Sequence, residues 1–181
     1  MTDLSTIAAG FYDRYAYPAY LRVHSSLVGQ VAAVLASARA ARGDAVDVAN
    51  VTLAGYLHDI GRSPLMKDDP RDHNQLSALI LAAEGLSACV EPARRHAIYA
   101  VLDAATAPRT LADKIVYVAD RRGGMKIEPL AERARGTAAR NPKYVAEIER
   151  AVPLALEIER EVFDGLPFAP DALEQHVLVR S

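Results

Sequence analysis

The sequence predicts an all-α protein, a single helical bundle domain of about seven or eight helices. Apolar residues recur three and four positions apart in almost every segment, which is the spacing of one face of an α-helix. Residues suited to start or stop a helix flank these segments. No alternating run of Val, Ile and Thr reaches strand length. The 181 residues are enough to bury one sizeable core, so residues 1–181 are treated as one domain.

The predicted helices of the N-terminal half are each bounded by a start or a stop signal. Residues 21–42 carry one continuous apolar face, and Gly43 ends the run. Asp47 and Asp72 are suited to cap the next two helices with their side chains. The four helices are expected before Tyr17, over residues 21–42, from Asp47 to just before Gly61, and from Asp72 to Gly85.

The C-terminal half carries similar signals. A proline suits the first turn of a helix, and a threonine followed three residues later by an aspartate resembles a capping box. The expected helices run from Pro92 to Val101, from Thr110 with Asp113 in its capping box, from Asn141 to about Phe163 with a kink at Pro153, and from Asp171. The last two form a C-terminal helical segment of about residues 141–179. Its amphipathic part, residues 142–163, could pack inward or against a second copy, so a homodimer is one expectation.

Composition excludes several classes of protein. A net charge of −2 and a pI near 6.2 give no basic footprint for nucleic acid or for an anionic membrane. The single cysteine, Cys89, cannot form an intrachain disulfide and fits a reducing compartment. The N-terminus lacks the basic region of a signal peptide, and no apolar run approaches about 18 residues. We therefore expect a cytoplasmic protein.

Six side chains that can bind metal are spaced along the chain at intervals of 34, 1, 14, 23 and 24 residues. They are His24, His58, Asp59, His73, His96 and Asp120. Five of the six lie at or beside an apolar stripe of a predicted helix, where an unpaired imidazole or carboxylate is costly to bury. A bound metal ion would compensate them, which indicates an enzyme site.

Each of these residues also has a simpler interpretation. His58 and Asp59 could be a helix-terminal histidine beside a surface aspartate, and His24 and Asp120 could be satisfied buried polar groups. His73 follows a predicted N-cap and could be exposed. His96 adjoins two arginines, which suggests partial exposure.

The adjacent residues His58 and Asp59 would supply two neighbouring metal ligands. They fall on the last turn of a predicted helix, where two side chains about 100° apart can still reach one ion. Asp59 could also bridge two ions through its two oxygens. Imidazole and carboxylate ligands without thiolates suit iron or manganese, with cobalt, nickel or zinc as alternatives, and do not resemble structural zinc.

Three segments that carry these residues resemble the HD-domain superfamily of metal-dependent phosphohydrolases. The segments are LRVHSSLVGQVA around His24, LAGYLHDIGR around His58-Asp59, and LADKIVYVADR ending at Asp120. The resemblance covers about residues 20–125. It implies a first metal ion held by His24, His58, Asp59 and Asp120, and a second held by His73 and His96, with Asp59 bridging a dinuclear centre.

The resemblance also implies an activity. The expected reaction is hydrolysis of a phosphoester or phosphoanhydride bond in a small metabolite, a nucleotide or dinucleoside polyphosphate, by metal-activated water. Asp59 and Arg62 are the expected catalytic residues. The cationic side chains expected to bind the substrate are Arg62, Arg121, Arg122 and Lys126. A di-iron oxygenase, or a nucleotide-binding regulatory module without turnover, would have the same set of ligands.

Two departures from the family pattern bear on the substrate. Many members have lysine where this chain has Arg62, and the two side chains differ in fork geometry and hydration. The Gly-Tyr-Pro element of the cyclic-dinucleotide phosphodiesterases is absent after His96. That branch of the family is therefore disfavoured.

Overall fold

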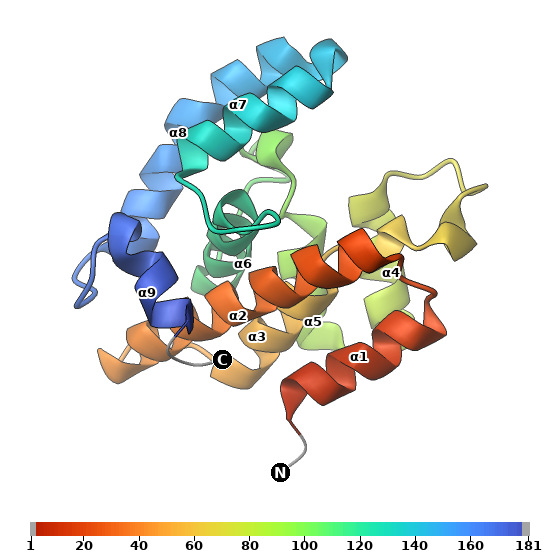
Figure 1. Cartoon of the computed structure of the whole chain (residues 1–181), viewed down its shortest axis with the longest axis horizontal. Helices are drawn as coiled ribbons and strands as arrows, with labels where there is room; N and C mark the ends of the chain where they lie inside the picture. Colours follow the sequence, from red (N-terminus) through yellow and green to blue (C-terminus); the bar gives the residue numbers. More distant parts are fainter. Residues whose placement is uncertain (1–2, 179–181) are drawn as a thin grey trace.

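A computed structural model describes residues 3–178 and confirms the all-α prediction (Figure 1). Within that range there are nine α-helices: α1 Leu4–Arg14, α2 Ala19–Ala41, α3 Val48–Leu57, α4 His73–Ala83, α5 Ser87–Arg94, α6 Leu111–Arg122, α7 Leu130–Arg140, α8 Val145–Phe163 and α9 Leu173–Leu178. Short 3₁₀ helices join them: η1 Ile60–Arg62, η2 Pro64–Met66, η3 Ile98–Leu102, η4 Pro142–Tyr144 and η5 Pro170–Ala172. Among the described residues, β-type pairing is limited to an isolated bridge between Gly123 and Ile127.

Three predicted helix starts in the motif-bearing region, those at Asp47, Asp72 and Thr110, are confirmed. The Asp47 carboxylate accepts from the third backbone N–H of α3, and the Asp72 carboxylate accepts from the backbone N–H of Asn74 in α4. Thr110 and Asp113 form a reciprocal capping box at the start of α6. These caps determine where α3, α4 and α6 begin and therefore where their first and last turns present side chains.

Small residues bring α2 and α3 into close contact. A methyl group at Gly29 would lie 2.3 Å from the ring of Tyr56, and one at Gly55 would lie 2.8 Å from the Ala32 side chain. Only glycine leaves room for backbones to approach this closely. The middle of α2, one turn after His24, is thereby held against the turn of α3 that precedes the His58-Asp59 pair.

Helix α6 runs through the middle of the fold, and its residues 115–120 are all buried. The main hydrophobic core gathers buried side chains from all nine helices of the described residues. Helices α7 and α8 form a hairpin beside α6 (Figure 1), and they contact η3 through a second, smaller cluster of Ile98, Ala134, Ile148 and Ala151. The hairpin is therefore packed against the segment that follows α5.

One predicted helix was wrong, and the predicted start of another was displaced. The helix from Pro92 to Val101 does not form: α5 begins at Ser87, contains Pro92 and ends at Arg94. The His96 imidazole donates to the Ala93 carbonyl, which the backbone N–H of residue 97 would use in a continued helix. Helix α7 was not predicted. Asn141 does not cap α8 with its side chain, which donates instead to the Thr137 carbonyl, and α8 begins at Val145 and continues through Pro153. Residue 179, the predicted end of the C-terminal segment, lies outside the described residues.

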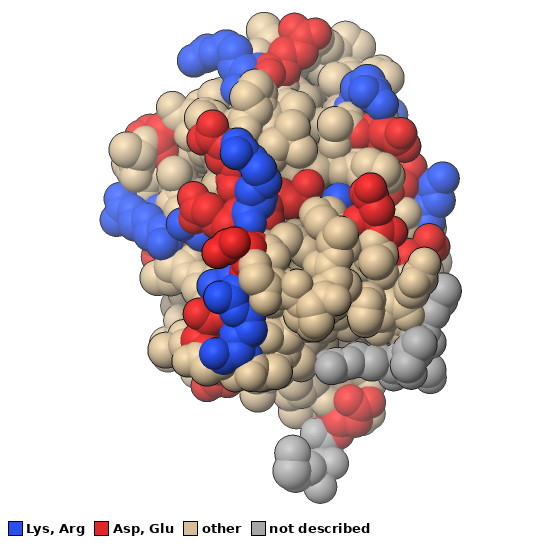
Figure 2. Space-filling view, turned by 90° about the vertical axis from the view of Figure 1, so that its left-hand side faces the viewer, with Lys and Arg blue, Asp and Glu red and all other residues tan. Residues whose placement is uncertain are grey.

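The surface carries mixed charge. Figure 2 shows the side of the molecule at left in Figure 1, where Lys and Arg alternate with Asp and Glu and neither sign forms a continuous field. This distribution agrees with a net charge near zero. Between residues 3 and 178, no helix combines the length and the apolar character needed to cross a membrane.

Candidate metal centre

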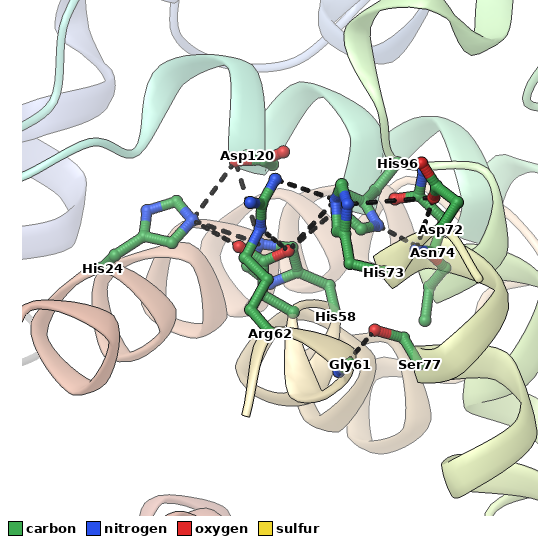
Figure 3. A network of polar contacts seen from close by, with 12 residues as sticks. His24, His58, Gly61, Arg62, Asp72, His73, Asn74, Ser77, His96 and Asp120 are labelled. Atoms are coloured by element: carbon green, nitrogen blue, oxygen red, sulfur yellow. Dashed lines mark hydrogen bonds and ion pairs between the residues drawn. The ribbon is translucent and has the colours of Figure 1, made fainter. Parts of the chain in front are cut away.

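The six side chains that can bind metal come from five parts of the chain and converge beside one cavity. Figure 3 labels five of them, all except Asp59. His24 lies on α2, and His58 and Asp59 follow the last turn of α3. His73 is the first residue of α4, His96 lies just past the end of α5, and Asp120 lies near the end of α6. The predicted set, whose first and last members are 96 positions apart in sequence, therefore meets at one place in the fold.

Donor atoms of His24, His58 and Asp120 lie within 4.8 Å of one another, as ligands of one ion would, and Asp59 lies beside them. The Nε2 atoms of His24 and His58 are 3.2 Å apart, and they lie 3.4 Å and 3.8 Å from Oδ1 of Asp120. Oδ2 of Asp59 lies 3.6 Å from each of these two Nε2 atoms. Metal–ligand bonds of about 2.1 Å would separate neighbouring donors by roughly 3.0–3.4 Å. An ion could bind here after small adjustments of the side chains.

The other oxygen of Asp59 faces the remaining histidines. Oδ1 lies 3.2 Å from Nε2 of His96 and 3.6 Å from Nε2 of His73. The two oxygens of one carboxylate thus face two pairs of imidazoles, which is the arrangement of a bridging ligand. Asp59 is the residue through which a second ion could be held.

Two of the histidines are oriented by helix C-termini. Nδ1 of His58 donates to the Gly55 carbonyl at 2.8 Å, and Nδ1 of His96 donates to the Ala93 carbonyl at 2.6 Å. Each carbonyl belongs to a last helical turn and lacks a partner within its helix. These hydrogen bonds place the proton on Nδ1 and leave the Nε2 lone pair directed into the site, as in metal-ligating histidines generally.

The buried groups carry the charges that metal binding requires. Burial lowers the pKa of His58 to about 3 and the pKa of His73 to about 4. Burial raises the pKa of Asp59, but His58 and Arg62 outweigh this effect and hold that pKa well below its usual value. A similar balance, with a neighbouring arginine and histidines, lowers the pKa of Asp120. At neutral pH the two imidazoles are neutral and both carboxylates are ionised, which fits a divalent cation.

Arg62 lies at the second pair of histidines. Its Nε donates to Oδ1 of Asp59 at 2.8 Å, and its Nη2 lies 2.8 Å from Nε2 of His73. Two triads have ligand atoms within 4.8 Å of one another, and they involve all the predicted ligands except His73. A second ion would therefore compete with the Arg62 guanidinium for His73 and for one oxygen of Asp59.

A cavity of about 910 Å³ opens over the centre, within the range of small-molecule sites. Of the predicted substrate-binding residues, Arg62, Arg121 and Lys126 line it. Arg122 does not, which corrects that prediction: its side chain is buried and its Nε donates to Oε1 of Glu159 at 2.6 Å. Neighbouring residues on α6 point about 100° apart, so Arg121 faces the cavity and Arg122 faces the core.

Helix α7 supplies residues that sequence reasoning missed. Arg133, Thr137 and Arg140 line the cavity from one face of this helix. The Arg133 Nε donates to the backbone carbonyl of Asp120 at 3.0 Å, and its Nη2 lies 3.7 Å from Oδ1 of that residue. The spacing of these three residues, i, i+4 and i+7, was a signal of one polar helix face that could have identified them.

Comparison with known families agrees with this geometry. The family model for the HD domain matches residues 22–125, more than half of the chain. The matched segment contains all six converging side chains and ends before α7. No curated protein and no solved structure shows a significant match to the chain.

Proposed function

The chain belongs to the HD-domain family, and from that premise we propose that it is a metal-dependent phosphohydrolase acting on a small phosphorylated metabolite, a nucleotide in particular. The observation that carries the proposal is the meeting of His24, His58, Asp59 and Asp120 within 3.2–3.8 Å contacts at the wall of a cavity lined with arginine. We further propose iron or manganese as the ion, because imidazole and carboxylate donors suit both.

A divalent ion held by these residues would supply an activated water and neutralise charge on the phosphoryl group. The protein orients the side chains that would hold the ion. Asp59 is held by the Arg62 guanidinium and by its place after α3, so its oxygens keep their directions toward the two pairs of histidines. His58 is locked by its bond to the Gly55 carbonyl, so the site is formed before substrate arrives.

The cavity favours an anionic substrate. Five Arg and Lys side chains line it against four carboxylates, so the lining is already positive by one charge and a bound divalent ion would add two more. Two of the cationic groups, Arg121 and Arg133, contact Asp120 and so lie beside the first ion position. Guanidinium forks bind phosphoryl oxygens in pairs, which commonly contributes a few kcal/mol to a phosphoryl-transfer transition state.

The test begins with protein purified under reducing, anaerobic conditions. Bound metal is measured, and nucleotides and dinucleoside polyphosphates are screened for phosphate release with Fe(II), Mn(II) and Co(II). We expect turnover, and we expect saturating metal, at about 100 times its Kd, to stabilise the fold by about 2.7 kcal/mol. His58→Ala should abolish both effects.

His176→Ala is the matched control, because this exposed histidine stacks on Phe168 away from the cavity. It should keep the activity and the metal stabilisation of the wild type. Absence of phosphate release from every substrate with all three metals would refute the proposed function, as would full activity in His58→Ala.

A further inference from the structure

The cavity has a second wall that lies beyond the family-matched residues 22–125. It is formed by α7, η4 and the start of α8. The small hydrophobic cluster of Ile98, Ala134, Ile148 and Ala151 packs this hairpin against η3, so the wall is a built part of the fold. The residues that line this wall come from the C-terminal third of the chain.

Helix α7 connects the two ends of the cavity. Arg133 lies at the metal end, where it contacts Asp120. Arg140 lines the same cavity two turns further along the same helix face. Seven residues at a rise of 1.5 Å each place the two backbone positions about 10 Å apart along the helix axis.

Arg140 differs from the arginines at the metal end. Arg62, Arg121 and Arg133 each lie within ion-pair distance of Asp59 or Asp120. For Arg140, no carboxylate of residues 3–178 lies within such a distance, and its side chain is exposed at the cavity. It therefore presents to the cavity a positive charge that no carboxylate of the described residues neutralises, and its Nη1 lies back over Gly136, one turn nearer to Arg133 than its own backbone.

Two neighbouring tyrosines line the cavity between the start of α4 and the end of α7. The rings of Tyr99 and Tyr144 have centroids 6.4 Å apart and planes inclined by 30°, and both residues line the cavity. The Tyr99 hydroxyl donates to Oδ2 of Asp72 at 3.0 Å and accepts from Nδ2 of Asn74 at 3.3 Å, which fixes the ring. Tyr144 is 41% exposed, and Nζ of Lys143 lies 4.6 Å from the centroid of its ring, so a planar group would stack there by displacing this flexible side chain.

We propose that Arg140, Tyr99 and Tyr144 form a distal subsite that makes nucleoside polyphosphates the preferred substrates. The terminal phosphate lies at the metal centre, the remaining phosphates follow α7 toward Arg140, and the base stacks on the tyrosines. Water adds to the terminal phosphorus and the bond to the bridging oxygen breaks. ATP would yield ADP, orthophosphate and one proton. This inference rests on the proposed function for the cleavage and adds the residues that select the substrate.

The test compares ATP with p-nitrophenyl phosphate, which has one phosphate and no base, on the manganese-loaded protein. Arg140→Ala should lower the ratio of kcat/KM for ATP to that for p-nitrophenyl phosphate about tenfold, the size expected for one lost hydrogen bond to a charged group. Tyr144→Ala should lower the ratio by a similar factor, and Tyr144→Phe should restore it because the ring remains.

Arg135→Ala is the matched control, since Arg135 lies on the same helix, has a side chain 74% exposed, and pairs with Glu132 outside the cavity. It should leave the ratio unchanged. A ratio that is unchanged in Arg140→Ala, or that falls equally in Arg135→Ala, overturns the distal subsite even if the enzyme hydrolyses phosphate esters.

Calorimetric binding of ATP separates this inference from the proposed function. If no phosphate is released from any substrate, the hydrolase assignment fails. The subsite is still supported if Arg140→Ala then weakens ATP binding about tenfold and Arg135→Ala does not. Equal affinity in all three proteins overturns it.

Discussion

Gly61→Ala offers a direct test of how the α3–α4 connection builds the centre. Gly61 lies in η1, two residues after Asp59, and its N–H donates to the Ser77 hydroxyl at 2.9 Å. An added methyl carbon would lie 2.2 Å from the carbonyl oxygen of His73 and 2.6 Å from the backbone nitrogen of Ser77. Both atoms belong to the α4 backbone, so no side-chain rotation can relieve the overlap.

The magnitude follows from that geometry. Ordinary contact begins near 3.4 Å, so η1 and α4 must separate by roughly an ångström, a forced overpacking that costs about 1–3 kcal/mol. Straining the buried bond to Ser77 adds about 1 kcal/mol. A total near 3 kcal/mol lowers the Tm of a chain of this size by roughly 6–12 °C.

The same movement should weaken the second half of the centre. His73 begins α4 and Asp59 precedes η1, so separating these elements lengthens the 3.6 Å contact between them. His24, His58 and Asp120 lie on other elements and should keep their spacing. We expect Gly61→Ala to retain the tighter bound ion and to lose affinity for any second one, measured by metal titration and metal content.

Gly10→Ala is the control, because a methyl group there meets no atom within 4 Å in the middle of α1. It should raise stability by about 0.5–1 kcal/mol, since alanine is the better helix former. Thermal and urea unfolding of both variants check these values. A Tm for Gly61→Ala within about 1 °C of the wild type would refute the close-approach argument.

Two further predictions concern buried charge. The folded-state pKa values of His58 (about 3) and His73 (about 4) lie below that of an unfolded histidine, so the unfolded chain binds more protons below about pH 6.5. The metal-free protein should therefore lose stability as the pH falls from about 6.5 to 4. The loss in unfolding free energy should reach up to about 1.4 kcal/mol per pH unit for each histidine. Equal urea midpoints at pH 7 and pH 5 would contradict this. Arg122→Met should destabilise by about 3–5 kcal/mol, because it leaves Glu159 charged and buried, and adding Glu159→Leu should recover much of the loss. Unfolding free energies of the single and double variants check the pairing, and a single variant as stable as the wild type would rule it out.

Local signals explain what could be predicted of the fold. The caps at Asp47, Asp72 and Thr110 depend on residues two or three positions away, so they can be recognised in the sequence and reappear in the structure. Helix α7 escaped prediction for a physical reason. It buries only Leu130 and Ala134, because its other face lines a polar cavity and so carries no apolar stripe.

The same distinction holds for the site. Residue type and order were enough to identify six candidate ligands, since buried imidazoles and carboxylates need compensation wherever they lie. Sequence could not decide which of two adjacent arginines, Arg121 or Arg122, faces the cavity. That depends on the position of Glu159, 37 residues further along the chain.

The sequence by itself therefore determined the helical class, the caps of the motif-bearing helices and the chemical identity of the candidate centre. These rest on periodicity and on side-chain chemistry, which are local properties. Only the tertiary structure decided that the two oxygens of Asp59 face separate pairs of histidines, that Arg62 contacts one of those pairs, and that α7 closes the cavity with Arg140. Each of these features depends on how helices distant in sequence pack together. The packing places the backbones, and the backbones set the distances between side chains and the directions in which they point.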